Sequence, residues 1–563
     1  MKTARKNFPT TRVVAKRMTG TTTMRSALIL GAVVLLAGCA VGPDYERPDL
    51  DLPESRFDST LLSQQQQQEL AYWWTRYHDP TLNKLIDQAL DSNLQIALQF
   101  QRIRQARAEL GFQNAQLYPS VEGQAQAQRQ RTGVGGFASG GGASGLGGAG
   151  TSGGSAGGNS SNNVGGGAGG GGGNQVQRFN FFSVTGTLNY EFDLWGALRR
   201  SAEQARAQLL SSAYTQDSLR LMVVSDVVTN YMSLRSFQRQ IAVTKETIKT
   251  RLQGYRLDKK RYEFGAINKL VLLQTKSLLQ SARAQLPPLE QQADRLQTSL
   301  AILTGKTPRQ IMNTTTVPDG DFEDLTLPTD LPVVLPSSLI ERRPDIRAAE
   351  ASLIAANANV GVAKARFFPT LNLSAGLGTQ ALDVSDLFEP YSELQRISGS
   401  ITAPILDFGR INAQYRSSKA QKAQAEIQYR QAVRQAFQEV ENALQAVKYS
   451  RQRYLAIQDQ VESYRETLRL ARLRYQVGRT DFFDVLDAQR NLFSSQLELA
   501  DAIASRFTAT ADLYKALGGG WTQQSDSLDP ALQEVANDYE PVPGEKDGAG
   551  AATANAPIPG NDP

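Results

Sequence analysis

The 563-residue chain has few of the side chains that most often carry out chemistry. It contains one cysteine, Cys39, and one histidine, His78. A single cysteine cannot form a disulfide within the chain. A single histidine excludes a His-rich metal site and leaves little scope for a His-based catalytic triad. The sequence therefore argues against an enzyme, and it indicates no cofactor and no metal site.

The chain also lacks a long apolar run at its N-terminus. Residues 27–37 form an apolar stretch of about 11 residues, whereas a membrane-spanning helix needs roughly 20. This stretch follows a basic region and ends in Leu36-Ala37-Gly38-Cys39, which resembles the cleavage box of bacterial lipoproteins. We therefore expect residues 1–38 to be a signal peptide and Cys39 to carry covalent lipid. Translation could start at Met1 or at Met24.

The basic and acidic residues nearly balance once residues 1–38 are set aside. The formal net charge of the whole chain is +5, but residues 1–38 hold seven Lys or Arg and no acidic residue. The rest has 53 basic and 55 acidic residues. The basic balance therefore does not indicate a nucleic-acid partner. Ala40 follows the cysteine, and lipoproteins without Asp at that position usually go to the outer membrane.

The rest of the chain is an internal duplication. Residues 195–305 recur 213 positions later, and residues 96–119 recur 250 positions later. The matches include Trp195-Gly196 with Phe408-Gly409, Gly265 with Gly478, Gly305 with Gly518, and Tyr118-Pro119 with Phe368-Pro369. The two offsets differ by an insertion in the first copy, where residues 133–173 contain 22 glycines. We expect this tract to be a flexible loop at a hairpin tip, facing outside the cell.

Each copy carries two segments that alternate between apolar and polar residues, as strands with one apolar face do. They lie near residues 121–128, 182–190, 371–377 and 397–403. Their polar faces are rich in Gln, Ser, Thr and Asn. Each segment is about ten residues long, which is enough for a tilted strand to cross a membrane.

The other segments of each copy are predicted to be helical. Two stretches with no proline and little glycine, 196–262 and 410–476, would each give about 100 Å of helix. Apolar residues recur at coiled-coil spacing. Shorter helices are expected at 93–117, 268–304, 345–367 and 481–517, and Pro287-Pro288 predicts a kink or break in the second of them.

These elements predict a domain order. It runs from the signal peptide, 1–38, to an N-terminal segment, 39–92, and the first repeat, 93–305. A Pro-rich linker, 306–344, the second repeat, 345–518, and a C-terminal segment with a disordered tail, 519–563, follow. The fold class is therefore mixed: long coiled-coil helices forming an α-barrel, joined to a transmembrane β-barrel.

Four strands are too few to close such a barrel, and open strand edges are not stable in lipid. Two chains would give eight strands and an interior filled by side chains, and three would give twelve strands and a lumen. The polar strand faces suit a water-filled interior. We therefore expect a homotrimer in which three chains share one barrel, with four strands from each.

Several motifs resemble those of the TolC-like outer membrane efflux proteins, in the lipoprotein (NodT-type) branch. The matching segments are Val41-Gly42-Pro43-Asp44-Tyr45-Glu46-Arg47-Pro48, Trp73-Trp74 with His78-Asp79-Pro80, residues 190–196, residues 339–347 and residues 484–489. The resemblance implies a trimeric duct through the outer membrane and periplasm that performs no chemistry itself. It also implies contact with outer membrane lipids, a periplasmic adaptor protein and an inner-membrane pump of the resistance-nodulation-division type.

The resemblance also implies a gate at the periplasmic helix tips. Asp484 and Asp487 match acidic residues that ring the narrow entrance in the family, and Tyr475 matches a tyrosine of the latch. The match is incomplete, because Thr480 stands where the latch has an arginine and Val271 stands at the corresponding acidic position of the first repeat. A ring of carboxylates would favour cations. The alternative is that Asp484 and Asp487 are ordinary carboxylates near a helix N-terminus.

The function predicted from the sequence is an exit duct for small molecules such as drugs or toxic compounds. The alternatives are a protein-secretion duct of the same fold, a pore-free periplasmic structural lipoprotein, and an enzyme tethered by lipid. The alternating segments argue against a pure spacer, and the shortage of catalytic residues argues against the enzyme. No residue identifies the transported substrate.

Overall fold

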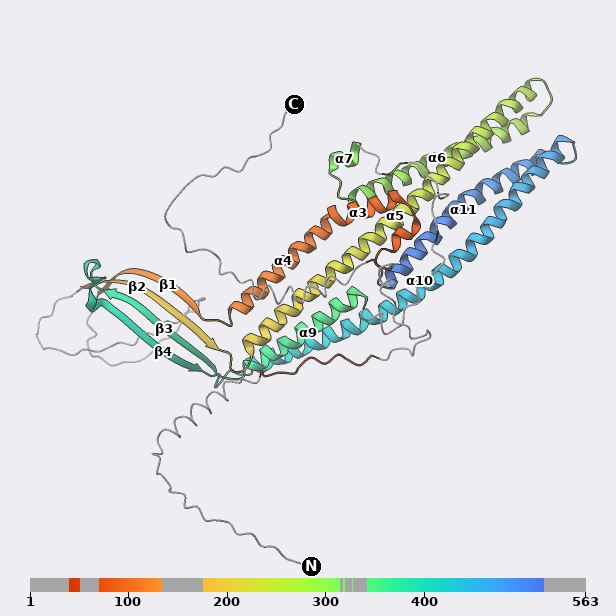
Figure 1. The fold of residues 1–563 in the computed structure, drawn as a ribbon. Helices are drawn as coiled ribbons and strands as arrows, with labels where there is room; N and C mark the ends of the chain where they lie inside the picture. The colour runs from red at the N-terminus through yellow and green to blue at the C-terminus, as the bar shows by residue number, and fades with distance from the viewer. Residues whose placement is uncertain are drawn as a thin grey trace, which may run out of the picture. The chain divides into compact units, whose positions relative to one another are not determined.

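The computed structural model describes residues 40–50, 70–133, 176–313, 317–318, 322, 327 and 342–520. The chain forms two compact units: a sheet unit, residues 116–194 and 368–405, and a helical unit made from the rest (Figure 1). The expectations for the signal peptide, for Cys39, for the Gly-rich loop, for most of the linker 306–344 and for the C-terminal tail lie outside the described residues.

The sheet unit holds four antiparallel strands in the order β1-β2-β3-β4. They are β1 (Ser120–Gly133), β2 (Val176–Phe192), β3 (Thr370–Ala381) and β4 (Glu393–Thr402). Two short 3₁₀ helices, η2 (Val384–Asp386) and η3 (Pro390–Ser392), connect β3 to β4. The two strands predicted in each copy are confirmed, and β1 and β4 lie at the edges of the sheet within this chain.

The strand register places residues of like polarity in continuous rows. One row runs through Val121, Leu188, Ala375 and Ile397, and the next runs through Ser120, Asn189, Ser374 and Ser398. The hydroxyls of Ser374 and Ser398 are hydrogen-bonded at 2.7 Å. Because side chains alternate between the two faces of a strand, the alternation in sequence becomes one apolar face and one polar face across the sheet.

The helical unit contains three pairs of helices with matching lengths. They are α4 (Leu94–Ala115) and α9 (Pro344–Ala365) with 22 residues, α5 (Ala197–Glu263) and α10 (Arg410–Gln476) with 67, and α6 (Lys269–Leu303) and α11 (Phe482–Ala516) with 35. Their bounds differ by the same 250 and 213 positions as the sequence repeats. The duplication predicted from the sequence is therefore present in the structure.

Three smaller elements complete the described part of this unit: η1 (Trp73–Tyr77), α3 (Pro80–Ser92) and α7 (Pro308–Asn313). None of the three is predicted from the sequence as a separate helix. Asp79 caps α3, since its carboxylate accepts hydrogen bonds from the backbone N–H groups of Thr81 and Leu82. This cap explains why α3 begins at Pro80, a first-turn position where proline is well tolerated.

Of the kink or break expected at Pro287-Pro288, the break does not occur, because α6 is continuous through both prolines. The kink stays a prediction. Neither proline can donate a hydrogen bond to the preceding turn. Both lie on the exposed side of α6, where water can hydrate the freed carbonyl groups. The opposite side packs along α5. The packed face therefore keeps the helix intact where the local sequence disfavours it.

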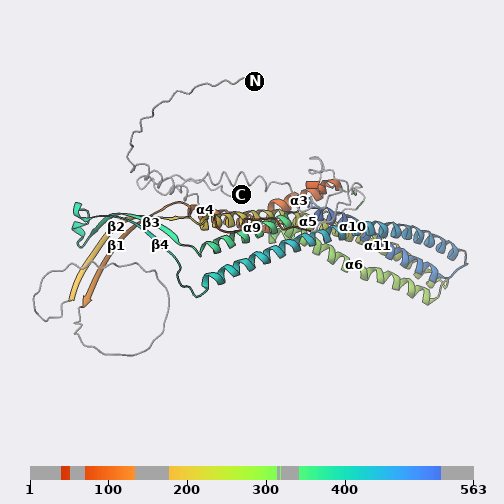
Figure 2. The same ribbon diagram turned by 90° about the horizontal axis from the view of Figure 1, so that it is seen from below.

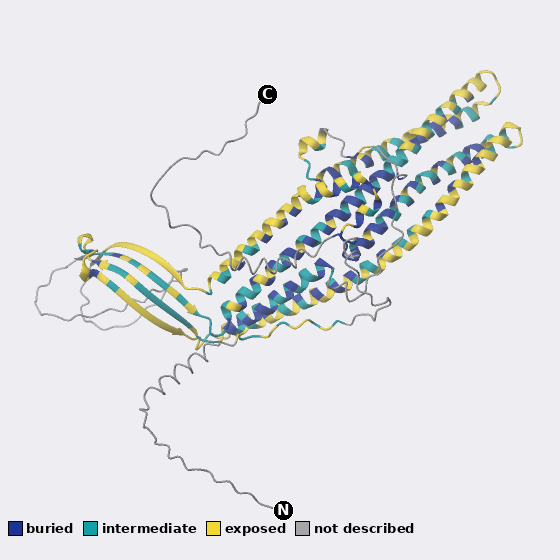
Figure 3. Ribbon diagram, in the orientation of Figure 1, coloured by how far each residue is buried: buried dark blue, intermediate teal, exposed yellow. Residues whose placement is uncertain are grey.

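The long helix α5 packs along α4, α6, α9 and α11, whereas α10 packs along α9 and α11. Figure 2 shows α11 lying beside the second half of α10, the half that leads to the turn between them. The buried residues follow the faces that these helices turn toward one another (Figure 3). The apolar stripes predicted from the sequence are packing stripes.

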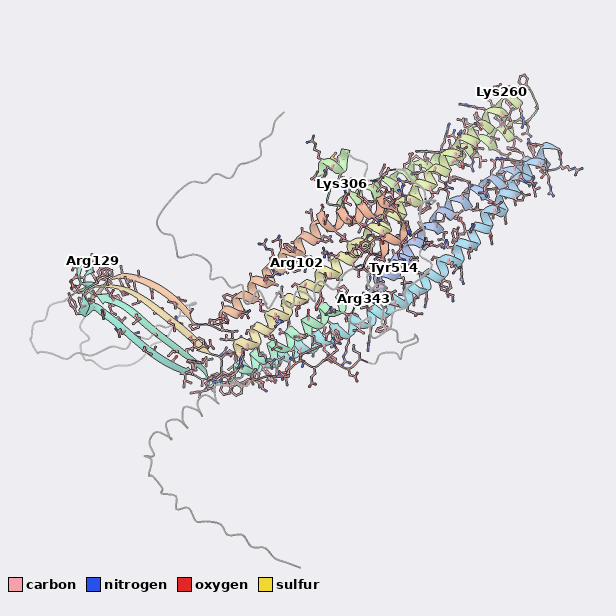
Figure 4. All side chains as sticks on the ribbon, in the orientation of Figure 1. Arg102, Arg129, Lys260, Lys306, Arg343 and Tyr514 are labelled. Atoms are coloured by element: carbon pink, nitrogen blue, oxygen red, sulfur yellow. The ribbon has the colours of Figure 1, made fainter. Side chains whose placement is uncertain are left out.

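The largest buried cluster joins η1 and α3 to α5 and α11. In it the ring of Trp73 stacks on that of Tyr514, with centroids 5.2 Å apart. Tyr514, labelled in Figure 4, belongs to the last turn of α11. The Tyr77 hydroxyl donates a hydrogen bond to the backbone oxygen of Phe507 at 3.1 Å. These contacts hold the segment containing Trp73-Trp74 against α11.

Residues 40–50, which we call the N-terminal strap, pass the start of α5 and run along α9. The Val41 N–H donates to the Trp195 oxygen at 2.9 Å. Arg200 forms an ion pair with Asp44 at 2.5 Å, and Arg47 binds both carboxylate oxygens of Glu350 at 2.7 and 2.8 Å. The strap therefore ties the first repeat to the second.

Among the described residues, none of the helices has both the length and the apolar character required to cross a membrane.

Candidate gate at the helix tips

The α10–α11 hairpin turns at Gly478, whose φ is +72°. The N–H of Arg479 donates to the Arg474 oxygen at 2.9 Å, and that of Gly478 donates to the Tyr475 oxygen at 3.1 Å. This is a Schellman motif. It favours glycine at position 478 because the residue there adopts the left-handed conformation. The turn places the start of α11 directly beside the end of α10.

Asp484 and Asp487 lie in the first two turns of α11, three residues apart and therefore on one face of the helix. The Asp484 carboxylate accepts a hydrogen bond from the Thr480 hydroxyl. The Asp487 carboxylate accepts one from the Asn491 side-chain amide at 2.9 Å. Asp484 is exposed and Asp487 partly so. The helix macrodipole favours negative charge at this end, so both carboxylates are well tolerated here.

Tyr475, near the end of α10, lies beside the start of α11 but not against either carboxylate. Its ring packs on Phe482, with centroids 5.1 Å apart. It borders a buried cluster formed by Leu468, Val485 and Ala488. Within the described residues its hydroxyl makes no side-chain hydrogen bond. The structure therefore gives Tyr475 a packing contact within this chain and leaves its hydroxyl for another partner.

The α5–α6 tip has the same turn but different chemistry. Gly265 has φ +73°, and Ala266 donates to the Arg261 oxygen at 2.8 Å. Here Asn268 caps α6 by accepting from the Val271 N–H at 3.0 Å. Val271 occupies the position of Asp484. The carboxylate pair therefore belongs to one of the two hairpins.

From the sequence, Thr480 is only a departure from the family's latch. In the structure its hydroxyl binds Asp484, so it orients one of the two carboxylates. The signal that could have revealed this contact is the spacing, because a threonine four residues before an aspartate spans the start of a helix. In the part of the chain that is described, no three His, Cys, Asp or Glu side chains are placed to hold a metal ion.

The sequence profile of the outer membrane efflux protein family matches residues 85–306 and 335–519. The chain belongs to this family. Both matched segments end near Gly305 and Gly518, where the two repeats end. The expected outer membrane localisation and the mixed fold, mostly helical with a small antiparallel sheet, are those of the family.

Individual relatives agree with this assignment. The antibiotic efflux pump outer membrane protein ArpC of Pseudomonas putida is 32% identical over 506 residues, covering 87% of this chain and 94% of ArpC. The probable outer membrane lipoprotein SilC of Salmonella typhimurium is 27% identical over 499 residues, covering 88% and 99%. The crystal structure of a membrane protein from Pseudomonas aeruginosa, 29% identical, superposes with a TM-score of 0.73 over 86% of this chain and 98% of that one.

Proposed function

We propose that this outer membrane efflux protein is the passive exit duct of a tripartite system for small molecules. The observation that carries the proposal is the duplicated unit itself, two long helical hairpins in one chain with a four-stranded sheet. Within the described residues, β1 and β4 each have one edge without a strand partner. The duct performs no chemistry. Its partners are a periplasmic adaptor and an inner-membrane pump of the resistance-nodulation-division type, which supplies the energy.

The functional duct is a homotrimer. Lipid cannot satisfy the free N–H and C=O groups of β1 and β4, so another copy must pair with each. Three chains supply twelve strands, which is enough for a lumen, whereas two supply eight and a filled interior. The polar row through Ser120, Asn189, Ser374 and Ser398 suits the water-facing side of such a barrel.

Lipid on Cys39 anchors each chain in the outer membrane. The lipobox sequence motivates this proposal, and the relative named as a lipoprotein, SilC, supports it. The strap begins immediately after Cys39, and its Val41 binds Trp195 at the point where the chain leaves the sheet unit. Lipid on this residue would therefore enter the membrane near the strands rather than at the far helix tips.

The gate of the duct consists of Asp484, Asp487 and Tyr475. Three copies of each carboxylate around a narrow opening repel one another and attract cations. The shared face of Asp484 and Asp487 supports this role. The Tyr475 hydroxyl, which makes no side-chain hydrogen bond within the described residues, supports a latch to a neighbouring hairpin in the assembled trimer.

Planar-bilayer conductance of the purified, lipidated protein tests the proposal. We expect steady channels, and we expect the double variant Asp484→Ala/Asp487→Ala to widen them or lower their preference for cations. Asp459→Ala, an exposed carboxylate elsewhere on α10, is the matched control. Unchanged selectivity in the double variant would reject the gate. Absence of both conductance and a detergent-resistant trimer would instead favour the pore-free lipoprotein.

A further inference from the structure

Charged residues on the apolar face of the sheet gather at one end of it. Residues of a strand alternate between the two faces, so the apolar face takes every second residue of each strand. Within the described strands, the charged residues that the register places on this face are Arg129, Arg131, Arg178 and Glu393. All four lie at the end of the sheet away from its junctions with the helices, and Figure 4 labels Arg129 there.

The part of this face nearer the helices consists of apolar residues and glycine. On β1 it runs through Val121, Gly123, Ala125 and Ala127 before it reaches Arg129. Apolar side chains on this face are open to the surroundings of the chain: Leu377 is 65% exposed and Ile397 is 83% exposed. Such a face suits lipid tails, as the outside of a transmembrane barrel does.

The arginines begin at the depth where the hydrocarbon layer should end. Val121 and Arg129 are eight residues apart on β1, which is about 27 Å along a strand. At a tilt of about 35–45° this corresponds to a depth of about 19–22 Å, whereas the apolar band of such a barrel is about 25 Å tall. Arg129 therefore lies near the outer boundary of the band, and its long side chain can extend to the lipid headgroups.

The charges at this end of the face do not balance. Arg129 is exposed and forms no ion pair within the described residues. The register pairs Arg131 directly with Arg178, and like charges in opposed positions destabilise a sheet. Against these three arginines stands one acidic residue, Glu393, on the other edge strand. Each copy therefore has an excess of positive charge on this face, which an anion from outside the chain would neutralise.

We propose that Arg129, Arg131 and Arg178 bind the phosphate groups of lipopolysaccharide, the anionic glycolipid of the outer leaflet of the outer membrane. Arginine binds phosphate through paired, charge-assisted hydrogen bonds, and basic clusters at the level of the headgroups bind anionic lipids. The acyl chains of the same lipid would lie along the apolar part of the face. This inference rests on the proposed function, because it takes the apolar face as the outside of the barrel.

The position of the three arginines favours a lipid over a soluble anion or a neighbouring copy. A soluble anion inside the duct would meet the polar face, where Arg396 is the basic residue of the described strands. Glu393 would approach the arginines only across a junction between two copies, and one carboxylate would still leave two arginines unpaired. The phosphates of the surrounding lipid can supply an anion for each of them.

Native mass spectrometry of the purified, lipidated trimer tests the proposal, with lipid A, the phosphorylated anchor of lipopolysaccharide, as the probe. We expect the parent protein to bind lipid A. The triple variant Arg129→Gln/Arg131→Gln/Arg178→Gln should bind it at least about tenfold more weakly, because charge-assisted hydrogen bonds to phosphate are strong. Arg396→Gln is the matched control, since it removes an exposed arginine from the opposite face of the same sheet. This control should bind lipid A as the parent does.

Two further probes identify what the arginines recognise. Lipid A from which the phosphates have been removed should bind the parent as weakly as intact lipid A binds the triple variant. Inorganic phosphate, added at the same concentration as lipid A, should not displace it, because the acyl chains contribute to binding along the apolar face. If the triple variant does not assemble, the single variant Arg129→Gln should still bind lipid A severalfold more weakly than the parent.

Three outcomes would overturn the inference: equal binding of lipid A by the parent and the arginine variants, equal binding with and without the phosphates, or displacement by inorganic phosphate. Loss of the trimer in both the triple variant and Glu393→Gln, with lipid A binding unchanged in Arg129→Gln, would assign the arginines to the junction between copies instead.

Conductance in phosphatidylcholine bilayers, which contain no lipopolysaccharide, separates failure of this inference from failure of the duct. A parent protein that conducts but shows no phosphate-dependent binding of lipid A would reject the lipid site and leave the duct intact. Absence of conductance in the parent would reject the duct itself.

Discussion

A single buried carboxylate links two helices of the helical unit. One oxygen of Asp79 caps α3, accepting from the N–H groups of Thr81 and Leu82 at 2.8 and 3.2 Å. The other oxygen accepts from the Tyr231 hydroxyl on α5. Arg235 donates two hydrogen bonds to the same Tyr231 oxygen, at 3.0 and 2.7 Å. Asp79 thereby fixes the start of α3 against α5.

We expect Asp79→Ala to be strongly destabilising. Loss of the cap costs about 1 kcal/mol, and a buried hydroxyl left without its acceptor costs about 1–3 kcal/mol more. Asp79→Asn keeps a capping oxygen and should cost less. Thermal unfolding in detergent, monitored by circular dichroism, ranks the melting temperatures of the parent and the two Asp79 variants. Asp87→Ala, at an exposed position of α3, is the control, and equal melting of the Asp79→Ala variant and the parent would contradict this account.

The carboxylate of Asp226 on α5 should make stability depend on pH. Burial raises the pKa of Asp226 above its usual range, and Lys515 only partly opposes this. The folded state therefore binds this proton more tightly than the unfolded state. Stability is then lost as pH rises from about 4, the unfolded pKa, through the folded pKa.

Asp226→Asn removes this dependence, so the variant should melt at a higher temperature than the parent at pH 7.5. The two proteins should differ little at pH 3.5, where the unfolded carboxyl is also protonated. Melting temperatures at both pH values, with Asp459→Asn as an exposed control, test whether stability falls as pH rises. A stabilisation of equal size at both pH values would point to packing rather than to charge.

At the scale of helices and strands, much of the structure was predictable from the sequence. Apolar periodicity, with glycines at positions 196, 265 and 305 as helix boundaries, predicts the ends of α5 and α6 to within about two residues. Helix ends are predictable because they depend on local sequence. The break allowed for at Pro287-Pro288 is wrong, because the prediction considered the local cost of the prolines and not the packing of α6 on α5. Arg251 was not predictable either. Its guanidinium binds the Leu278 oxygen of α6, the next helix, and lies over the Phe493 ring of α11, which is distant in the sequence. Nothing adjacent to Arg251 in the chain indicates these contacts.

The two prolines within the continuous helix α6 should therefore lower the stability of that helix. We expect Pro287→Ala/Pro288→Ala to stabilise α6 by about 2 kcal/mol or more. A proline in a helix interior costs about 3 kcal/mol relative to alanine, and the looser unfolded chain returns only about 0.4–1 kcal/mol of this for each substitution. Hydrogen exchange of the α6 amides should slow in the variant.

Pro80→Ala, at the first residue of α3, is the matched control. Proline is favoured at that position because its missing N–H would have no partner in the helix. This variant should gain no stability. If both variants behaved alike, the cost of the α6 prolines would already be relieved in the structure.

At the scale of the whole molecule, the duplication predicts how separate copies meet. The β1–β2 pairing of Ser120 with Asn189 recurs as the β3–β4 pairing of Thr370 with Thr402, shifted by 250 and 213 positions. The unpaired edges β4 and β1 are the repeat equivalents of β2 and β3. A closed barrel in which every junction repeats would therefore pair β4 of one copy with β1 of the next in the β2–β3 register.

This rule gives specific partners. Within the chain Thr187 pairs with Gly376 and Leu188 with Ala375. The same shifts place Ser400 of one copy opposite Gln126 of the next, and Ile401 opposite Ala125. Ser400 and Gln126 are both polar-face residues, and Ile401 and Ala125 both belong to the apolar face. The derived register therefore keeps each face continuous around the ring, as it is within the chain.

Engineered disulfides test this register directly, because the chain has no cysteine other than Cys39. Directly opposed residues of antiparallel strands have Cα atoms about 4.5–5.5 Å apart, within the range that a disulfide spans. We expect either Gln126→Cys/Ser400→Cys or Ala125→Cys/Ile401→Cys to give a covalently closed trimer on a non-reducing gel. Two pairs are needed, since hydrogen-bonded and non-hydrogen-bonded positions alternate along the edge and differ in how readily they form the disulfide.

The off-register pair Gln126→Cys/Thr402→Cys is the control, and this variant should stay monomeric under the same oxidation. A covalent trimer from the off-register pair alone would mean that the junction between copies does not repeat the junction within each, because a shift of two residues preserves the faces while changing every partner.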